Sequence, residues 1–117
     1  MANTIPDGSS EGPLAGIRVL DLTTERAELA GRMMADLGAD VLKIEPPEGA
    51  RARQLAPFDE RLEAPRDGDH PRSLYWAAVG AGKRSLVLDV EVSEDRDRLA
   101  GLALEADVLF ESYAPGY

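Results

Sequence analysis

The sequence contains no cysteine, which excludes disulfide bonds and any chemistry that needs a thiol. It also contains no apolar run long enough to cross a bilayer, and its first residues lack the basic region and apolar segment of a signal peptide. These absences are compatible with a reducing compartment. We therefore expect a soluble, cytoplasmic protein that has no membrane partner.

Positive charge is scarce in this chain. Asp and Glu number 22 against 13 Lys and Arg, the formal net charge is -9, and no tract of basic residues offsets it. Binding to the phosphates of nucleic acids requires clustered Lys and Arg. We therefore expect no nucleic-acid partner.

Several familiar ligand sites are missing as well. Neither G-x-G-x-x-G nor G-x-x-x-x-G-K-[ST] occurs, which argues against NAD, FAD and P-loop nucleotide binding. His70 is the one histidine, and no second His or Cys stands at a useful spacing from it. A metal site or a catalytic triad is therefore not expected.

The length of 117 residues suits one domain and is short for an enzyme with separate cofactor and substrate parts. Residues 1–12 are rich in Asn, Ser, Gly, Asp and Pro, and we expect them to form a disordered lead. Residues 13–117 are expected to form the ordered domain.

Residues 17–45 have the pattern of a strand, a helix and a second strand. The first strand is a short β-branched run that should end near Asp21 to Thr23, and residues 41–44 are expected to form the second. Parallel strands joined by a helix place the loop after the first strand at the carboxyl edge of the sheet. Open α/β folds bind ligands at this edge, so we expect a ligand near residues 23–27.

Helical periodicity predicts the helix between these strands. Its expected apolar face consists of Ala27, Ala30, Met34 and Leu37, widened by Leu29 and Met33. Thr23 or Thr24 is expected to cap its start, with Glu25 near the positive end of the dipole. Gly38 should supply the left-handed residue that ends it.

Residues 46–72 form a long irregular segment that is rich in Pro and Arg, with an apolar patch at residues 55–58. Such a loop is a functional lid, an interaction arm, a disordered insertion or a solvated linker.

The remaining chain alternates helices and strands. Ser73 is expected to cap a short helix over residues 74–79, and residues 84–90 should form a third strand. A second helix should begin at Ser93 with Ser93 as its cap, and residues 108–111 should form a fourth strand. The apolar face of that helix consists of Leu99, Leu102, Ala103 and Ala106. The order of elements predicts an α/β fold that is half of a doubly wound parallel sheet with flanking helices, so we expect a truncated chain.

Three groups of polar residues are candidate sites. The turn with Thr23, Thr24, Arg26 and Ala27 suits an anion at a helix N-terminus, although plain capping and a solvated ion pair explain it equally well. Lys83 and Arg84 form the one compact basic spot, which is more often solvated or paired with acids than a ligand site. Asp21 stands at a strand end, where we expect a capping role first.

Four motifs in order resemble the amino-terminal part of the family III CoA-transferases, also called the CaiB/BaiF family. They are PLAGIRVLDLT at residues 13–23, MADLGADVLKIEPP at 34–47, GKRSLVLD at 82–89 and ADVLFESYAPG at 106–116. This family includes formyl-CoA transferase, carnitine CoA-transferase and alpha-methylacyl-CoA racemase. The resemblance implies a Rossmann-like sheet that forms an incomplete half of the family's fold.

It also implies a transferase that moves coenzyme A from an acyl-CoA to a carboxylic acid through intermediates on an aspartate. The substrates would be CoA thioesters, no cofactor would be bound permanently, and the full-length chain would form an interlocked homodimer. The CoA contacts that it implies are Arg26, Ala27, Pro46, Leu88, Asp89, Val90, Glu91, Ser112, Tyr113 and Ala114.

Two departures from the family pattern stand out. The loop after the first strand contains Glu25 and Arg26 in place of a small Gly-Pro loop, and neither Pro46 nor Glu91 is cationic where relatives can place a cation. Arg26, Lys83 or Arg84 is expected to compensate.

The family's catalytic aspartate would follow beyond Tyr117. Asp21, Asp36 and Asp89 do not match its motif, so no catalytic residue is expected within this chain, which should be inactive alone. The alternatives are an acyl-CoA racemase of the same family and a non-catalytic interaction module.

Overall fold

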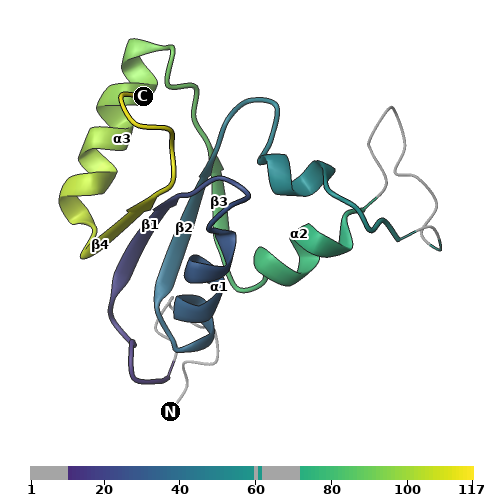
Figure 1. The fold of residues 1–117 in the computed structure, drawn as a ribbon. Coiled ribbons are helices and arrows are strands. Elements are labelled where there is room, and N and C mark those ends of the chain that lie inside the picture. Colours follow the sequence, from purple (N-terminus) through teal and green to yellow (C-terminus); the bar gives the residue numbers. More distant parts are fainter. Residues whose placement is uncertain (1–10, 60, 62–71) are drawn as a thin grey trace.

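A four-stranded parallel sheet forms the centre of the molecule (Figure 1). The computed structural model describes residues 11–59, 61 and 72–117. The strands are β1 (Arg18–Leu22), β2 (Asp40–Glu45), β3 (Arg84–Val87) and β4 (Val108–Glu111), in the spatial order β3-β2-β1-β4. All three strand pairs are parallel, which confirms the predicted α/β class.

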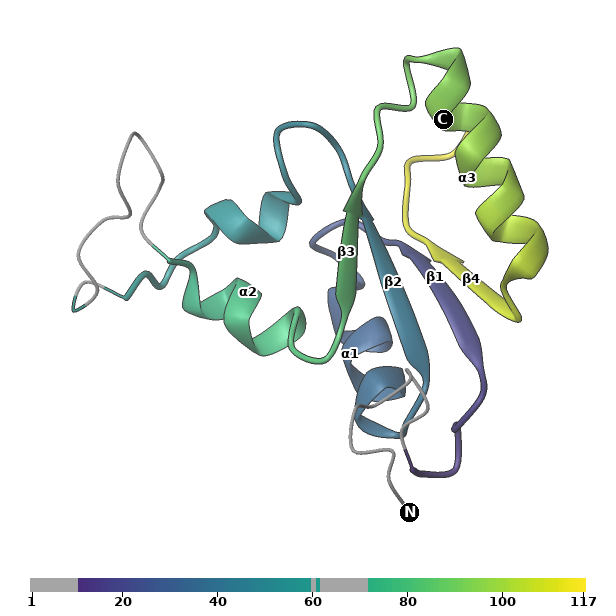
Figure 2. The same cartoon turned by 180° about the vertical axis from the view of Figure 1, so that it is seen from behind.

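Helices cover both faces of this sheet. Figures 1 and 2, drawn from opposite sides, show α1 (Glu28–Asp36) on one face and α3 (Ser93–Glu105) on the other. The 3-10 helix η1 (Arg51–Gln54) and α2 (Leu74–Val79) contact each other beyond the β3 edge. No described helix is both long and apolar enough to span a membrane.

Alternate residues of β1 point to opposite faces, so the core has two layers. Leu20 and Leu22 belong to the layer beneath α3, and Val19 to the layer on the α1 side. The predicted face of α3, formed by Leu99, Leu102, Ala103 and Ala106, packs on the first layer. That prediction is confirmed.

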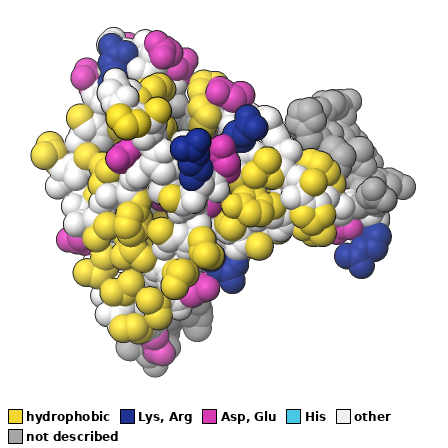
Figure 3. Space-filling view, viewed as in Figure 1, with side chains coloured by type: hydrophobic (Ala, Val, Ile, Leu, Met, Phe, Trp, Pro, Cys, Tyr) yellow, Lys and Arg dark blue, Asp and Glu magenta, His cyan; other side chains and the backbone are white. Residues whose placement is uncertain are grey.

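The predicted apolar face of α1 is wrong in part. Leu29, Met33 and Leu37 are 58%, 57% and 45% exposed, whereas Glu28 and Gly31 are the buried residues of the helix. The helix is rotated because the sheet beneath it carries buried charged side chains, to which Glu28 is a partner. Hydrophobic side chains consequently gather on the surface over β4, β1 and α1 (Figure 3).

Two helix starts differ from the predictions. Ala27, which has no side-chain capping group, is the N-cap of α1, while the Thr23 hydroxyl bonds to Asp21 and the Thr24 hydroxyl to Ser112 of the loop after β4. Ser93 lies inside α3 and is not its cap, and the N-cap Val92 has no side-chain capping bond.

Other terminal signals are confirmed. Ser73 caps α2 by accepting a hydrogen bond from the Trp76 N–H at 3.1 Å. Gly38 ends α1 with a φ of 104°, a conformation that favours glycine. Strand β3 ends at Val87, three residues earlier than expected, so Leu88 to Val90 already belong to the following loop.

The structure leaves two predictions partly outside the described residues. The predicted lead covers residues 1–12, of which 1–10 are not described. The predicted loop over residues 46–72 contains η1, and its residues 60 and 62–71, including His70, also fall outside.

Candidate functional site

A cavity of about 280 Å³ lies at the carboxyl edge of the sheet, where the ligand was expected. The loops that follow β1, β2, β3 and β4 all contribute to its walls. Its lining residues are Thr23, Thr24, Glu25, Glu28, Lys43, Ile44, Pro46, Glu48, Ala50, Arg51, Leu88, Val90, Tyr113 and Tyr117.

Four of the ten residues expected to contact CoA line this cavity, namely Pro46, Leu88, Val90 and Tyr113. The other six, which are not among its lining residues, are Arg26, Ala27, Asp89, Glu91, Ser112 and Ala114. Each of these six is a sequence neighbour of a lining residue, so the cavity lies where the four segments converge.

One wall of the cavity is apolar and aromatic. Leu88 is buried there, and the rings of Tyr113 and Tyr117 stack with centroids 4.8 Å apart and an interplanar angle of 29°. Burial raises the pKa of Tyr113, and the nearby Tyr117, Glu111 and Asp21 raise it further. This wall is suited to a flat or aliphatic part of a ligand.

A pair of hydroxyl side chains joins the loop after β1 to the loop after β4. Ser112 Oγ accepts a hydrogen bond from the Thr24 N–H at 2.8 Å, and the two hydroxyls lie 2.8 Å apart. Ser112 therefore links the two loops, and the Thr24 hydroxyl bonds to it and does not cap α1.

Four buried charged side chains form a cluster at the cavity, which two of them, Glu28 and Lys43, line: Asp21, Glu28, Lys43 and Lys83. Their exposed fractions are 0% to 1%. Lys83 Nζ is 2.8 Å from Asp21 Oδ2 and 2.7 Å from Glu28 Oε2, and Lys43 Nζ is 2.7 Å from Glu28 Oε1 and 3.5 Å from Asp21 Oδ1. Two carboxylates thus neutralise two ammonium groups in a region without solvent.

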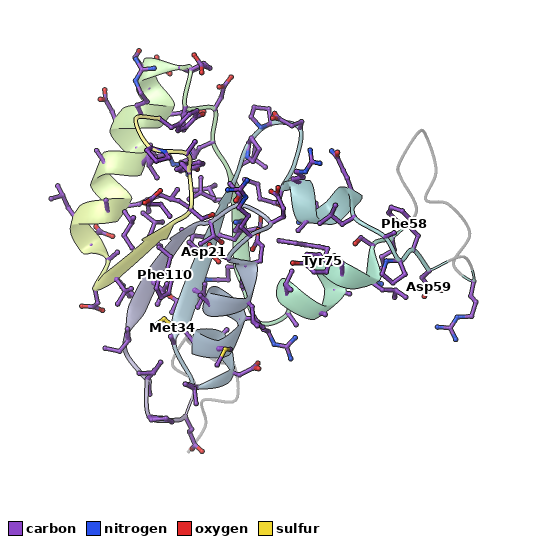
Figure 4. The ribbon with its side chains drawn as sticks, in the orientation of Figure 1. Asp21, Met34, Phe58, Asp59, Tyr75 and Phe110 are labelled. Carbon is purple, nitrogen blue, oxygen red and sulfur yellow. The ribbon has the colours of Figure 1, made fainter. Side chains whose placement is uncertain are left out.

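Asp21 is the member of this charged cluster that stands at the end of β1 (Figure 4). Burial pushes its pKa upward, but the ion pair with Lys83, the hydrogen bonds from Thr23 and the charge of Lys43 outweigh burial and hold the pKa below its ordinary value. Asp21 Oδ1 also accepts the Thr23 N–H at 2.9 Å. The expected capping role is not present, since the N-cap of α1 is Ala27 and Asp21 bonds within the turn after β1. Asp21 belongs instead to a buried ion pair that the sequence did not indicate.

Gly31 allows α1 to approach the charged cluster. A Cβ at this position would collide with Asp21 Oδ2 and would lie 3.0 Å from Lys83 Cε. Only a residue without a side chain fits between the helix and the carboxylate.

A third buried acid, Glu45, fixes the loop that follows β2. Glu45 accepts hydrogen bonds from Arg53 Nε at 2.6 Å, the Ala50 N–H at 3.1 Å and Ser85 Oγ at 2.6 Å. Burial alone would raise the pKa of Glu45, but these partners lower it below its usual range. The Arg53 guanidinium also lies 4.3 Å from the ring centroid of Trp76, so β2, β3 and α2 together hold η1 in place.

Arg51 and Glu25 face each other at the cavity. Arg51 Nε is 3.4 Å from Glu25 Oε1, and the two side chains are 70% and 30% exposed. Tyr75 of α2 donates a hydrogen bond from its hydroxyl to the Glu25 carbonyl at 3.1 Å (Figure 4). The sequence analysis selected neither Arg51 nor Glu25 as a ligand contact, although Arg51 belongs to the Arg-rich segment after β2.

The two residues of the basic spot, Lys83 and Arg84, do not line this cavity and lie apart from each other. The Lys83 side chain is 1% exposed within the charged cluster, and Arg84 pairs with Asp40 at 2.8 Å. Arg84 lines a separate cavity of about 240 Å³ at the opposite edge of the sheet, together with Arg18 and Glu105. Within the described residues, no group of His, Cys, Asp and Glu is arranged to hold a metal ion.

Comparison with known proteins gives one consistent family. Residues 14–117 match the model described as CoA-transferase family III. A succinyl-CoA:mesaconate CoA-transferase of Haloarcula hispanica is 40% identical over 107 residues, which are 90% of this chain and 26% of that protein. A succinate–glutarate CoA-transferase of Agrobacterium fabrum is 39% identical over 104 residues, 86% of this chain and 25% of that protein.

A solved structure supports the same grouping. The crystal structure of a CaiB/BaiF family protein from Brucella suis matches with a TM-score of 0.75 and 33% identity, over 89% of this chain and 26% of that one. The chain thus spans about a quarter of the length of the curated relatives that it matches.

Proposed function

Because the chain belongs to the family III CoA-transferases, we propose that it is the CoA-binding amino-terminal segment of an enzyme. That enzyme moves coenzyme A between an acyl-CoA and a carboxylic acid. The observation that carries the proposal is the cavity at the carboxyl edge, because Pro46, Leu88, Val90 and Tyr113 line it as the resemblance implies.

The cavity offers suitable chemistry for parts of CoA. Its aromatic and aliphatic wall fits a nucleobase or an aliphatic arm, and the loops after the strands supply polar groups near the opening. In this proposal CoA enters as a substrate and no cofactor stays bound.

The nucleophile of the reaction is not assigned to this chain. Asp21 is unsuitable, since its side chain is 0% exposed and its carboxylate is held by Lys83 and Thr23. Asp36 lies on the exposed side of α1, where it accepts hydrogen bonds from Arg32 at 3.0 Å. Catalysis in this proposal needs an aspartate that follows Tyr117.

Isothermal titration of the chain with CoA tests the binding proposal. We expect binding at one site, which is weakened strongly in Val90→Trp because the larger side chain fills the cavity. Val87→Trp is the matched control, since Val87 lies on β3, is 53% exposed and does not line the cavity. Absence of CoA binding to the unmodified chain, or equal affinity of the two Trp variants, contradicts the proposal.

We also propose a homodimer for the complete enzyme. Exposed apolar side chains on α1, including Leu29 and Met33, support an assembled state in which they are covered. Size-exclusion chromatography with light scattering on the complete enzyme tests this, and a monomeric mass over the working concentration range would exclude the dimer.

A further inference from the structure

Two of the residues that line the cavity at the carboxyl edge are cations, Lys43 and Arg51. Lys43 is 1% exposed, and its ammonium lies 2.7 Å from Glu28 Oε1 and donates to the Thr23 carbonyl. Its charge is therefore neutralised within the protein. The Arg51 side chain is 70% exposed, so among the described lining residues it is the cation that reaches solvent.

Arg51 and Arg53 lie on the same 3-10 helix but have different surroundings. Arg53 is bound to both oxygens of Glu45, at 2.6 Å and 3.0 Å, and lies against Trp76. It anchors η1 to the end of β2. Arg51 faces only a single carboxylate oxygen of Glu25 at 3.4 Å, which is longer than a charge-assisted hydrogen bond.

We propose that Arg51 is a phosphate-binding residue of this cavity: its guanidinium leaves Glu25 and binds a phosphate group of CoA. This inference rests on the proposed function, since it identifies the residue that receives the ligand's charge. A guanidinium can donate two parallel hydrogen bonds to a phosphate, which is a better partner than one distant carboxylate oxygen.

The charges around the cavity make this residue necessary for a polyanionic ligand. Glu25, Glu28 and Glu48 also line the cavity, and the whole chain has a formal net charge of -9. Glu28 is neutralised by Lys43 and Lys83, whereas Glu25 and Glu48 repel a phosphate. Arg51 is placed to offset that repulsion, and Glu25 competes with the ligand for it.

The test measures CoA affinity by isothermal titration at several salt concentrations in four proteins: the unmodified chain, Arg51→Ala, Glu25→Gln and Arg98→Ala. Arg98 is the matched control because it lies exposed on α3 and does not line the cavity. We expect Arg51→Ala to weaken CoA binding about tenfold and to reduce its dependence on salt, and Arg98→Ala to change neither.

Glu25→Gln gives an independent result because it keeps the arginine and removes its competitor. We expect this variant to bind CoA about two- to threefold more tightly, and circular dichroism checks that each variant is folded. If Arg51→Ala binds CoA as tightly as Arg98→Ala, the inference is overturned while the proposed function stands. If Glu25→Gln binds no more tightly than the unmodified chain, the competition with Glu25 is refuted. Failure of the unmodified chain to bind CoA overturns both the inference and the proposed function.

Discussion

Replacement of Lys83 by Met tests the buried charged cluster most directly. The substitution keeps an unbranched side chain of similar length and removes the ammonium that lies 2.8 Å from Asp21 and 2.7 Å from Glu28. It leaves two buried carboxylates with Lys43 as their remaining buried cation. The hydrogen bond from Lys83 to the Glu28 carbonyl, at 2.8 Å, is lost as well.

Removal of one partner from a buried ion pair costs about 3–5 kcal/mol, because the other charge stays buried without compensation. A whole domain is stable by about 5–15 kcal/mol, so this loss would be a large share of the total. Removal of a charge from an exposed side chain changes the free energy of unfolding by about 0.5 kcal/mol or less. Arg98→Met is therefore the control, since it removes one positive charge from the exposed side of α3.

The loss of stability caused by Lys83→Met should become smaller as pH falls. In the unmodified chain the pKa of Asp21 is lowered by folding. Asp21 therefore contributes to the stability of the fold above the pKa of an ordinary carboxylate, and this contribution is lost as pH falls through the pKa of Asp21 in the folded chain. Without Lys83, the largest contribution that lowers this pKa is lost, and we expect burial to raise it. Acid then protonates Asp21 in the folded variant and removes the unpaired charge, so the stability difference between the two proteins should shrink as pH falls.

Urea unfolding at several pH values, followed by circular dichroism and by the fluorescence of Trp76, measures this difference. Trp76 is the one tryptophan of the chain. A loss no larger than that of Arg98→Met would refute the argument that the cluster is buried and mutually compensated. A large loss that stays constant with pH would refute the assignment of the uncompensated charge to Asp21.

Three further perturbations follow from the geometry of the site. Gly31→Ala should destabilise the fold by about 1–3 kcal/mol despite the better helix propensity of Ala, because its Cβ would collide with Asp21 Oδ2. Thermal unfolding measures whether the variant is less or more stable, and a more stable variant would disprove the close approach. Ser112→Ala should cost about 1 kcal/mol in urea unfolding because the Thr24 N–H loses its acceptor, and an unchanged midpoint would show that water replaces it. In an ultraviolet titration, Tyr113→Phe should remove a transition above the usual tyrosine range, because the pKa of Tyr113 is raised; loss of a transition within that range would contradict this.

Much of the fold could be predicted because its signals are local. Periodicity identified all four strands and the face of α3, and Ser73 and Gly38 mark helix ends through contacts within a few residues. The position of the cavity followed from topology, since parallel strands joined by helices direct their carboxyl ends to one edge.

The charged cluster could not be predicted because its four members come from four segments that are distant in the sequence. Apolar periodicity favoured a face of α1 that includes Leu37, whereas Glu28 and Gly31 are buried through partners on β1, on β2 and before β3. Lys83 was interpreted with its neighbour Arg84 as a basic spot, yet the two side chains bind different acids on different sides of the sheet. Such pairings depend on tertiary distances that sequence spacing does not contain.

The charged cluster should protect both lysines of the chain from amine-directed reagents. Lys43 and Lys83 are the lysines of this chain, every other basic side chain apart from His70 being an arginine, and both ammonium groups are 1% exposed and held by carboxylates. Amine-directed reagents should therefore modify little except the amino terminus while the domain is closed. Acylation of these two side chains should therefore occur when transient unfolding exposes them. Mass spectrometry can measure its rate, and so the rate of unfolding, without any engineered label.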